Sequence, residues 1–173
     1  MRDAVRDESF VAFTREALPQ LARLAGTLTG NPEFAKDLVQ STLEKAYRNW
    51  HRINPGDAPY AYVRRIMVNT HYDGWRSNSV FRRLFGHRDD DPPEHRDTGP
   101  TPDEVWQSKA RIAEMLAPLT DKERAVITLR FLEDLSEADA AAELNIAPGT
   151  VKSTTSRALA KMRVNPVLQE VTR

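Results

Sequence analysis

The stretch LSEADAAAELNIAPGTVKSTTSRALAKMR, from Leu135 to Arg163, decides the fold because it predicts two short helices joined by a tight turn. Ser136 and Asp139 have the spacing of an N-terminal capping box, and Pro148 suits the first turn of the second helix. Asn145 tolerates the left-handed backbone that a sharp turn needs. An apolar set would lock the two helices at an angle: Leu135, Ala141, Leu144, Ile146, Val151, Leu159 and Met162.

The second of these helices is basic. No acidic residue occurs between Ala147 and Arg163, and the basic residues are Lys152, Arg157, Lys161 and Arg163. An apolar clamp that supports a basic helix is typical of a helix that enters the major groove of DNA. A plainer interpretation, a helical hairpin with a solvated basic face, stays open at this point.

Composition limits the classes of protein to which the chain could belong. The 173 residues suffice for one ordinary domain or two small ones, and the formal net charge is zero, so any nucleic-acid footprint must be local. There are no cysteines, which excludes disulfides and thiolate zinc sites. The N-terminus, MRDAVRDESF, is charged where a signal peptide is apolar, and no apolar stretch has membrane-spanning length. We therefore expect a soluble, cytoplasmic protein.

Breaks in the apolar pattern predict two small domains and a linker. Residues 77–102 contain the turn-forming sequences SNS, RDDDPPEHRD and TGPTP, which are typical of a flexible, acidic, proline-rich linker. Residues 1–76 then form an N-terminal helical bundle, and residues 103–166 form a C-terminal helix-turn-helix domain. Strand signals are nearly absent, so the predicted fold class is all-α.

Local signals place the first two helices. The first spans about Glu8–Thr29, and Pro19 is expected to kink or split it. The second has Asn31 as its N-cap and Pro32 at its first helical position, and it runs to about Trp50.

Three further helices follow from pattern and capping. One spans about Pro59–Arg76. Capping-box sequences at Thr101–Glu104 and Thr120–Glu123 then predict a helix after the linker and another before the helical hairpin.

Three segments in the same order resemble a known family. They are DLVQSTLEKAYRNW (Asp37–Trp50), AYVRRIMVNTHYDGWR (Ala61–Arg76) and the stretch from Leu119 to Arg163. Together they resemble a sigma-70-type factor, and more narrowly the small extracytoplasmic-function group (group four) of bacteria, in its actinobacterial-like form. The resemblance implies an RNA polymerase sigma factor that binds core enzyme, recognises the minus-thirty-five and minus-ten promoter elements and promotes DNA melting.

By this resemblance, the helix from Asn31 to Trp50 docks on the clamp coiled coil of core RNA polymerase. Its apolar set is too wide to serve only as a core stripe, and Glu44 lies on a neighbouring face with two polymerase-binding candidates, Asp37 and Gln40. Asp37 and Glu44 could equally be solvated surface charges. The polymerase-binding residues that the resemblance implies are Asp37, Leu38, Gln40, Leu43, Tyr47 and Trp50.

The third helix resembles the one that reads and holds open the minus-ten element. One of its faces is expected in the core: Val63, Ile66, Met67 and Thr70. Melted DNA needs cations for its phosphates, and stacking or amide groups for an extruded base. The resemblance gives the base contact to Asn69, with Tyr72 or Trp75 for stacking, and residues 51–58 correspond to the loop that cups the flipped base. The implied minus-ten set is Asn69, Arg64, Arg65, Tyr72 and Arg76.

The second hairpin helix is expected in the major groove at the minus-thirty-five element, with its N-terminal residues toward the bases and later basic residues toward phosphates. Arg124 and Arg130 are further candidates for backbone contacts. Thr154, Thr155 and Ala140 stand where many relatives carry larger or basic side chains, so we expect less packing and less phosphate attraction there. The implied DNA-facing set is Lys152, Ser153, Ser156, Arg157 and Lys161, of which Lys161 meets phosphate or stays solvated.

No pattern of residues indicates an enzyme. His87 and His95 flank an acidic run that could collect a divalent cation, but a flexible linker is a poor place for a preorganised site. We therefore predict no catalytic residue, metal or cofactor. Two other classes stay open: a stand-alone helix-turn-helix DNA-binding regulator, and an enzyme or binding module that uses the N-terminal helices. The partners that the resemblance implies are core RNA polymerase (clamp coiled coil and flap), promoter DNA and an anti-sigma factor, without membrane insertion.

Overall fold

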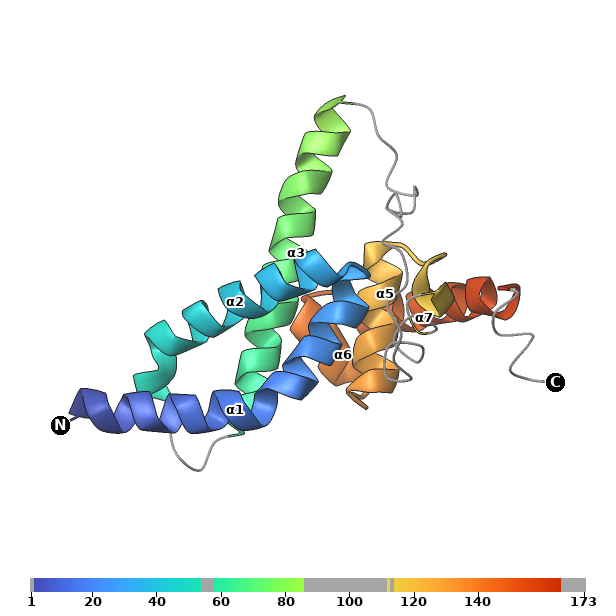
Figure 1. Cartoon of the computed structure of the whole chain (residues 1–173). Coiled ribbons are helices and arrows are strands. Elements are labelled where there is room, and N and C mark those ends of the chain that lie inside the picture. The colour runs from blue at the N-terminus through green and yellow to red at the C-terminus, as the bar shows by residue number, and fades with distance from the viewer. Residues whose placement is uncertain (1, 54–57, 86–111, 113, 166–173) are drawn as a thin grey trace, which may run out of the picture. The chain divides into compact units, whose positions relative to one another are not determined.

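The computed structural model describes residues 2–53, 58–85, 112 and 114–165, with the side chains of residues 7–53, 58–72, 112 and 114–165. The chain divides into two compact units, Met1–Gly74 and Trp75–Arg173. All regular elements of the described residues are helical, as Figure 1 shows. The predicted all-α class with two small domains is confirmed. No helix within the described ranges is long and apolar enough to cross a membrane.

The first unit opens with a long helix, α1 (Arg2–Thr29), which begins before the predicted start. Pro19 lies inside α1 without splitting it, and the helix changes direction along its length in Figure 1. A proline in a helix interior removes one hydrogen bond and crowds the preceding turn, which bends a helix when packing holds both halves. Of the two predicted effects of Pro19, splitting is therefore wrong.

The predicted cap of the second helix is confirmed. Helix α2 (Pro32–Asn49) begins where Asn31 Oδ1 accepts hydrogen bonds from the backbone N–H of Glu33 and Phe34, at 2.9 and 3.2 Å. Gly30 makes the reversal from α1 with a φ of 64°, a conformation that glycine adopts without strain. Helix α2 then packs against α1 and ends in a short 3₁₀ helix, η1 (Trp50–Arg52).

The third helix is longer than predicted. Helix α3 spans Pro59–Phe85, so the linker predicted for 77–102 is wrong in its first part. The sequence VFRRLF continues the apolar spacing of a helix beyond Arg76, and this periodicity outweighs the turn-forming SNS. The rest of that linker lies outside the described residues.

The core face of α3 is rotated slightly from the predicted one. Val63 and Met67 are fully buried as expected, but Val68 is buried too, whereas Ile66 and Thr70 are only half-buried. Thr70 accepts a 3.0 Å hydrogen bond from Lys45 Nζ, which links α3 to α2.

The second unit contains α5 (Asp121–Ile127), a π-helical turn η2 (Thr128–Leu132), α6 (Glu137–Leu144) and α7 (Pro148–Arg163). The predicted capping box at Thr120 is confirmed, since its side chain and that of Glu123 each accept the other's backbone N–H. The helix start predicted at Thr101–Glu104 lies outside the described residues. Leu159 and Met162 of α7 pack against a buried cluster of Leu116, Leu119, Ile127 and Ala158.

The helix-turn-helix forms through the predicted local signals. Ser136 Oγ accepts the backbone N–H of Asp139 at 3.0 Å and donates to the carboxylate of Asp139 at 2.6 Å. Asn145 makes the turn in the left-handed region, with φ 52° and ψ 48°. The clamp is closed by fully or nearly fully buried side chains on both helices, namely Ala140, Ala141, Leu144 and Val151.

Candidate nucleic-acid interface

Four of the predicted DNA-facing residues lie together on one exposed strip of α7. Lys152, Ser153, Ser156 and Arg157 are all exposed and follow one another at helical spacing. The opposite side of α7 is buried through Val151, Thr154 and Ala158. Because that side is held by the clamp, the strip must face outward. We call the four exposed residues the α7 strip.

The N-terminus of α7 is open as well as basic. Its N-cap residue, Ala147, offers no side-chain hydrogen bond, and Pro148 and Gly149 are exposed beside it. An added Cβ on Gly149 would meet nothing within 4 Å. Pro148 has no N–H, and the N–H groups of Thr150 and Val151 both donate to the Ala147 carbonyl. The attraction of this end for an anion such as a phosphate therefore comes mainly from the partial positive charge of the helix N-terminus.

Two threonines complete the base of the α7 strip. Thr154 is buried at 1% exposure, and its hydroxyl oxygen accepts a 3.4 Å hydrogen bond from Arg157 Nη2. Thr155 is half-buried, and its hydroxyl has no hydrogen-bond partner within the part of the chain that the structure describes. Neither threonine faces outward, so the α7 strip itself is unaffected by them.

Lys161, the fifth predicted DNA-facing residue, has a partner inside the unit. Its Nζ lies 2.9 Å from Glu123 Oε2, across the junction of α7 and α5. Burial alone would raise the pKa of Glu123, but hydrogen bonds from Lys161 and from the Thr120 backbone lower the pKa overall. The sequence expectation of phosphate contact or free solvation did not include this ion pair.

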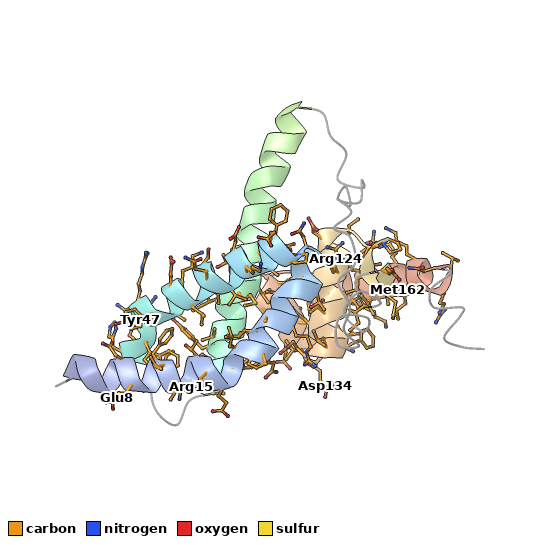
Figure 2. All side chains as sticks on the ribbon, viewed as in Figure 1. Glu8, Arg15, Tyr47, Arg124, Asp134 and Met162 are labelled. Atoms are coloured by element: carbon orange, nitrogen blue, oxygen red, sulfur yellow. The ribbon has the colours of Figure 1, made fainter. Side chains whose placement is uncertain are left out.

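Arg124 does not reach the surface, so its predicted DNA contact is wrong. The residue is 1% exposed on α5, where Figure 2 labels it. Nη2 donates to the Leu119 carbonyl at 3.4 Å and Nη1 lies 4.0 Å from Asp121, while Nε and Nη1 have no hydrogen-bond partner among the described residues. Burial lowers the pKa of Arg124. Every residue from Glu123 to Ile127 is buried, so this part of α5 has no exposed side on which Arg124 could lie.

Arg130 is half-buried and serves the loop before α6. Its guanidinium donates to the Leu135 carbonyl and lies 6.0 Å from the centre of the Phe131 ring. Phe131 is 59% exposed at the end of the π-helical turn, an exposed aromatic group that sequence analysis missed. A DNA-backbone role for Arg130 stays a prediction.

Helical register brings most of the minus-ten set onto one stripe of α3. Positions 65, 69, 72 and 76 are separated by four, three and four residues, the spacing of one helix face. Arg65 and Asn69 are exposed, and Tyr72 is half-buried. Arg64 is half-buried and lies beside this stripe, and the side chains of Trp75 and Arg76 lie outside the described residues. We call positions 65, 69, 72 and 76 the α3 stripe.

The predicted polymerase-binding set is divided between the surface and the interior of the first unit. Asp37 and Gln40 are exposed, and Gln40 donates to Glu44 at 3.1 Å. Leu38 and Trp50 are 7% and 8% exposed and belong to the packing of α2 on α1. The Trp50 indole donates to Ser9 Oγ at 2.9 Å, and its ring lies about 5 Å from those of Phe10 and Phe13.

Leu43 and Tyr47 lie between these extremes. Both are half-buried, and the Tyr47 hydroxyl donates to Asp7 at 2.7 Å, on the side of α2 that faces α1 in Figure 2. Sequence analysis missed Phe34, which is 63% exposed at the start of α2. The buried face of α2 contains Ala35 and Leu38, and Phe34 does not share their helical spacing. This register was the sequence signal that Phe34 would be exposed.

Metal binding finds no support among the described residues, which contain no group of three or more histidine, aspartate or glutamate side chains able to hold an ion. His87, His95 and the acidic run between them lie outside those residues. The absence of a metal site there stays a prediction.

Comparisons with known proteins agree with this arrangement. Residues 13–80 match Sigma-70 region 2, and residues 109–162 match Sigma-70, region 4. The RNA polymerase sigma-E factor of Streptomyces coelicolor is 32% identical over 173 residues, 99% of this chain and 92% of that protein. The ECF RNA polymerase sigma factor SigL of Mycobacterium tuberculosis is 37% identical over 155 residues, 87% and 84% of the two chains. The sigma factor RpoE of Bartonella quintana, solved with the anti-sigma factor NepR, has a TM-score of 0.64 at 26% identity, covering 94% of this chain and 98% of that one.

The chain belongs to the sigma-70 family, in its extracytoplasmic-function group, and its function is that of an RNA polymerase sigma factor. The resemblance of the three sequence segments is thereby confirmed. Members of this class are non-enzymatic transcription initiation factors. A stand-alone regulator would leave the region 2 match over residues 13–80 unexplained.

Proposed function

We propose that the α7 strip reads the minus-thirty-five element, that the α3 stripe reads and holds open the minus-ten element, and that the exposed side of α2 binds core RNA polymerase. The observation that carries this assignment is the α7 strip itself, which is exposed above a fully buried helical clamp. A rigid base of this kind lets a helix enter the major groove as a unit.

At the minus-thirty-five element, Lys152 and Arg157 supply the long cationic side chains that pair with guanine edges or phosphates. Ser153 and Ser156 are short and can approach base edges or backbone closely. The open N-terminus of α7 adds attraction for a phosphate. Together these groups combine positioning contacts with base reading on one helix face.

At the minus-ten element, the α3 stripe supplies what a melted strand needs. The Asn69 side-chain amide can both donate to and accept from a base edge, and exposed Arg65 can meet a phosphate. Tyr72 follows on the same stripe, where an aromatic ring can stack on an unpaired base. The role of Arg76 rests on its position in the same register.

At the polymerase, the exposed polar groups of α2 provide the specific contacts. Asp37, Gln40 and Glu44 form the outward rim, with half-buried Leu43 beside them. Leu38 and Trp50 hold the helix in place from below. Truncating Leu38 or Trp50 should therefore weaken polymerase binding through loss of folded structure, whereas truncating Asp37 should weaken it directly.

The same proposal includes where the chain acts and which molecules it binds. The chain acts in the cytoplasm on core polymerase and promoter DNA, and bond chemistry belongs to the polymerase. A regulatory anti-sigma partner is supported by the Bartonella quintana sigma factor, whose solved structure contains the anti-sigma factor NepR.

Run-off transcription from a randomised promoter library tests the proposal, with purified core bacterial RNA polymerase in the presence and absence of the chain. We expect discrete start sites only with the chain, and their loss with Asn69→Ala or Arg157→Ala. Arg23→Ala, an exposed arginine on α1, is the matched control and should retain them. Tight duplex binding by the chain alone without any initiation would favour a stand-alone regulator instead.

A further inference from the structure

Glu123 takes part both in the N-terminal cap of α5 and in an ion pair with α7. Its Oε2 accepts the Thr120 backbone N–H at 3.0 Å, which closes the capping box of α5, and it also accepts Lys161 Nζ at 2.9 Å. The side chain of Glu123 is 9% exposed and that of Lys161 is 43% exposed. One nearly buried carboxylate oxygen therefore connects the start of α5 with the last turns of α7.

The connection lies beside the apolar contact between the same helices. Leu159 and Met162, on either side of Lys161 in the sequence, pack against the cluster that contains Leu119 and Ile127. Apolar packing alone tolerates small rotations and slides, whereas a charged hydrogen bond fixes both direction and distance. The pair therefore adds a directional restraint to this contact, beside the 3.0 Å hydrogen bond that Asn165 Nδ2, just after α7, donates to the Glu114 carbonyl.

Such a restraint matters most at the far end of α7. Lys161 lies thirteen residues after Pro148, so it is roughly 20 Å from the N-terminus of the helix at about 1.5 Å per residue. A tilt of about 5° at the C-terminal end would displace the N-terminal end by roughly 1.7 Å over that length. A shift of this size exceeds the spread of N–H···O hydrogen-bond lengths, which is about 0.5 Å, so it would break a hydrogen bond to a base edge.

We propose that Glu123 is a positioning residue for α7, which holds Lys161 as a brace between α5 and α7 and thereby removes Lys161 from the phosphate contacts. This inference rests on the proposed role of α7 in promoter recognition. The sequence predicted that Lys161 meets phosphate or stays solvated. The proposal instead gives Lys161 a role within the unit, as the partner of Glu123.

The first test uses the free full-length chain, without DNA or polymerase. Lysine acetylation by an activated ester, followed by mass spectrometry, gives the modification rate at each lysine. We expect Lys161 to react several-fold faster in Glu123→Gln than in the unaltered chain, while half-exposed Lys122 reacts equally in both. Equal rates at Lys161 would overturn the brace, whatever the chain does with DNA.

The second test uses holoenzyme, formed from core bacterial polymerase and the full chain, on a promoter selected from the randomised library. The logarithm of the affinity is measured against the logarithm of the salt concentration for Glu123→Gln, Lys161→Met and Arg157→Met. Loss of one phosphate contact reduces that slope by about one. We expect this reduction for Arg157→Met, and an unchanged slope with roughly threefold to tenfold weaker binding at every salt concentration for the other two.

Controls separate positioning from folding and from the proposed function. Lys161→Met leaves the capping box intact, so its binding remains informative even if Glu123→Gln lowers stability, and Lys161→Arg should restore binding. Lys122→Met is the matched control. A reduced slope for Lys161→Met, or undiminished affinity for both variants, would overturn the positioning role. Failure to select any promoter would instead contradict the proposed function. The acetylation rates would still test whether Glu123 holds Lys161, because that measurement uses neither DNA nor polymerase.

Discussion

Arg124 carries a guanidinium into the interior of the second unit with few partners to replace the lost water. At 1% exposure it keeps one long hydrogen bond, to the Leu119 carbonyl, and an acid at 4.0 Å. Two of its nitrogen atoms have no hydrogen-bond partner among the described residues. The desolvation of a buried charge without good partners usually destabilises the folded state by more than its interactions stabilise it.

This balance predicts the effect of Arg124→Met, which keeps an unbranched side chain and removes the charge. We expect the free energy of unfolding to rise by about 1 kcal/mol, because desolvation of the guanidinium is avoided. Urea denaturation of the full chain measures the change, with exposed Arg163→Met as the control. A loss of more than about 1 kcal/mol would show that Arg124 is better compensated than its contacts indicate.

The carboxylate of Glu123 makes stability depend on pH in a defined direction. Its folded pKa is lowered from the ordinary value of 4.5, so the unfolded chain binds the proton more readily. The stabilising contribution is therefore complete above about pH 4.5 and is lost as the pH falls through the lowered folded pKa.

We therefore expect the unaltered chain and Glu123→Gln to differ most in free energy of unfolding near neutral pH. The difference should shrink as the pH falls below 4.5, because Glu123 then becomes protonated and loses its charged interactions. The glutamine does not titrate, so the stability of Glu123→Gln does not change for this reason. Denaturant unfolding at several pH values measures both proteins. Glu137→Gln, on α6, is the matched substitution. A difference that grows toward acid would contradict the assigned sign.

At the scale of elements, the helix-turn-helix depends on one left-handed residue. Asn145 ends α6 with φ 52° and ψ 48°, where a side chain with a Cβ normally costs about 1–2 kcal/mol and asparagine costs less. We expect Asn145→Ala to lower the free energy of unfolding by about 1 kcal/mol and Asn145→Gly to change it by only a few tenths. Thermal and urea denaturation of both variants check this. Equal effects of the two substitutions would show that backbone strain is not the cause.

Element starts were largely predictable because capping is local. The N-caps at Asn31, Thr120 and Ser136 each involve residues two or three positions away, and all three form as predicted. Element ends were less predictable. Helix α3 continues to Phe85 because weak turn signals compete with a helical apolar pattern, and local sequence alone does not rank the two.

The whole molecule consists of two compact units, each with its own buried side chains. We expect fragment 1–85 and fragment 103–173 each to retain helical circular dichroism and a cooperative thermal transition, because each keeps its core. Neither fragment alone, nor both added together, should support initiation, because in the proposed function each unit reads a different promoter element and the two elements must be read by one chain. A fragment 1–85 that is unfolded in isolation would contradict the independence of the first unit.

The sequence by itself determined the helical class, the caps, the turn at Asn145 and the family, because each depends on residues close together in the chain or on motifs in a fixed order. It also placed the α7 strip, since four residues on one helix face need only the helical period. These inferences required no knowledge of how distant segments meet.

Only the tertiary structure decided which predicted site residues are buried or already have a partner within the chain. Trp50 meets Ser9 across forty-one residues of sequence, and Lys161 meets Glu123 across thirty-eight. The burial of Arg124 likewise depends on which side of α5 the other helices cover. A polar or aromatic side chain looks the same in sequence whether it contacts a partner molecule or its own chain, and only the packing of remote segments distinguishes the two.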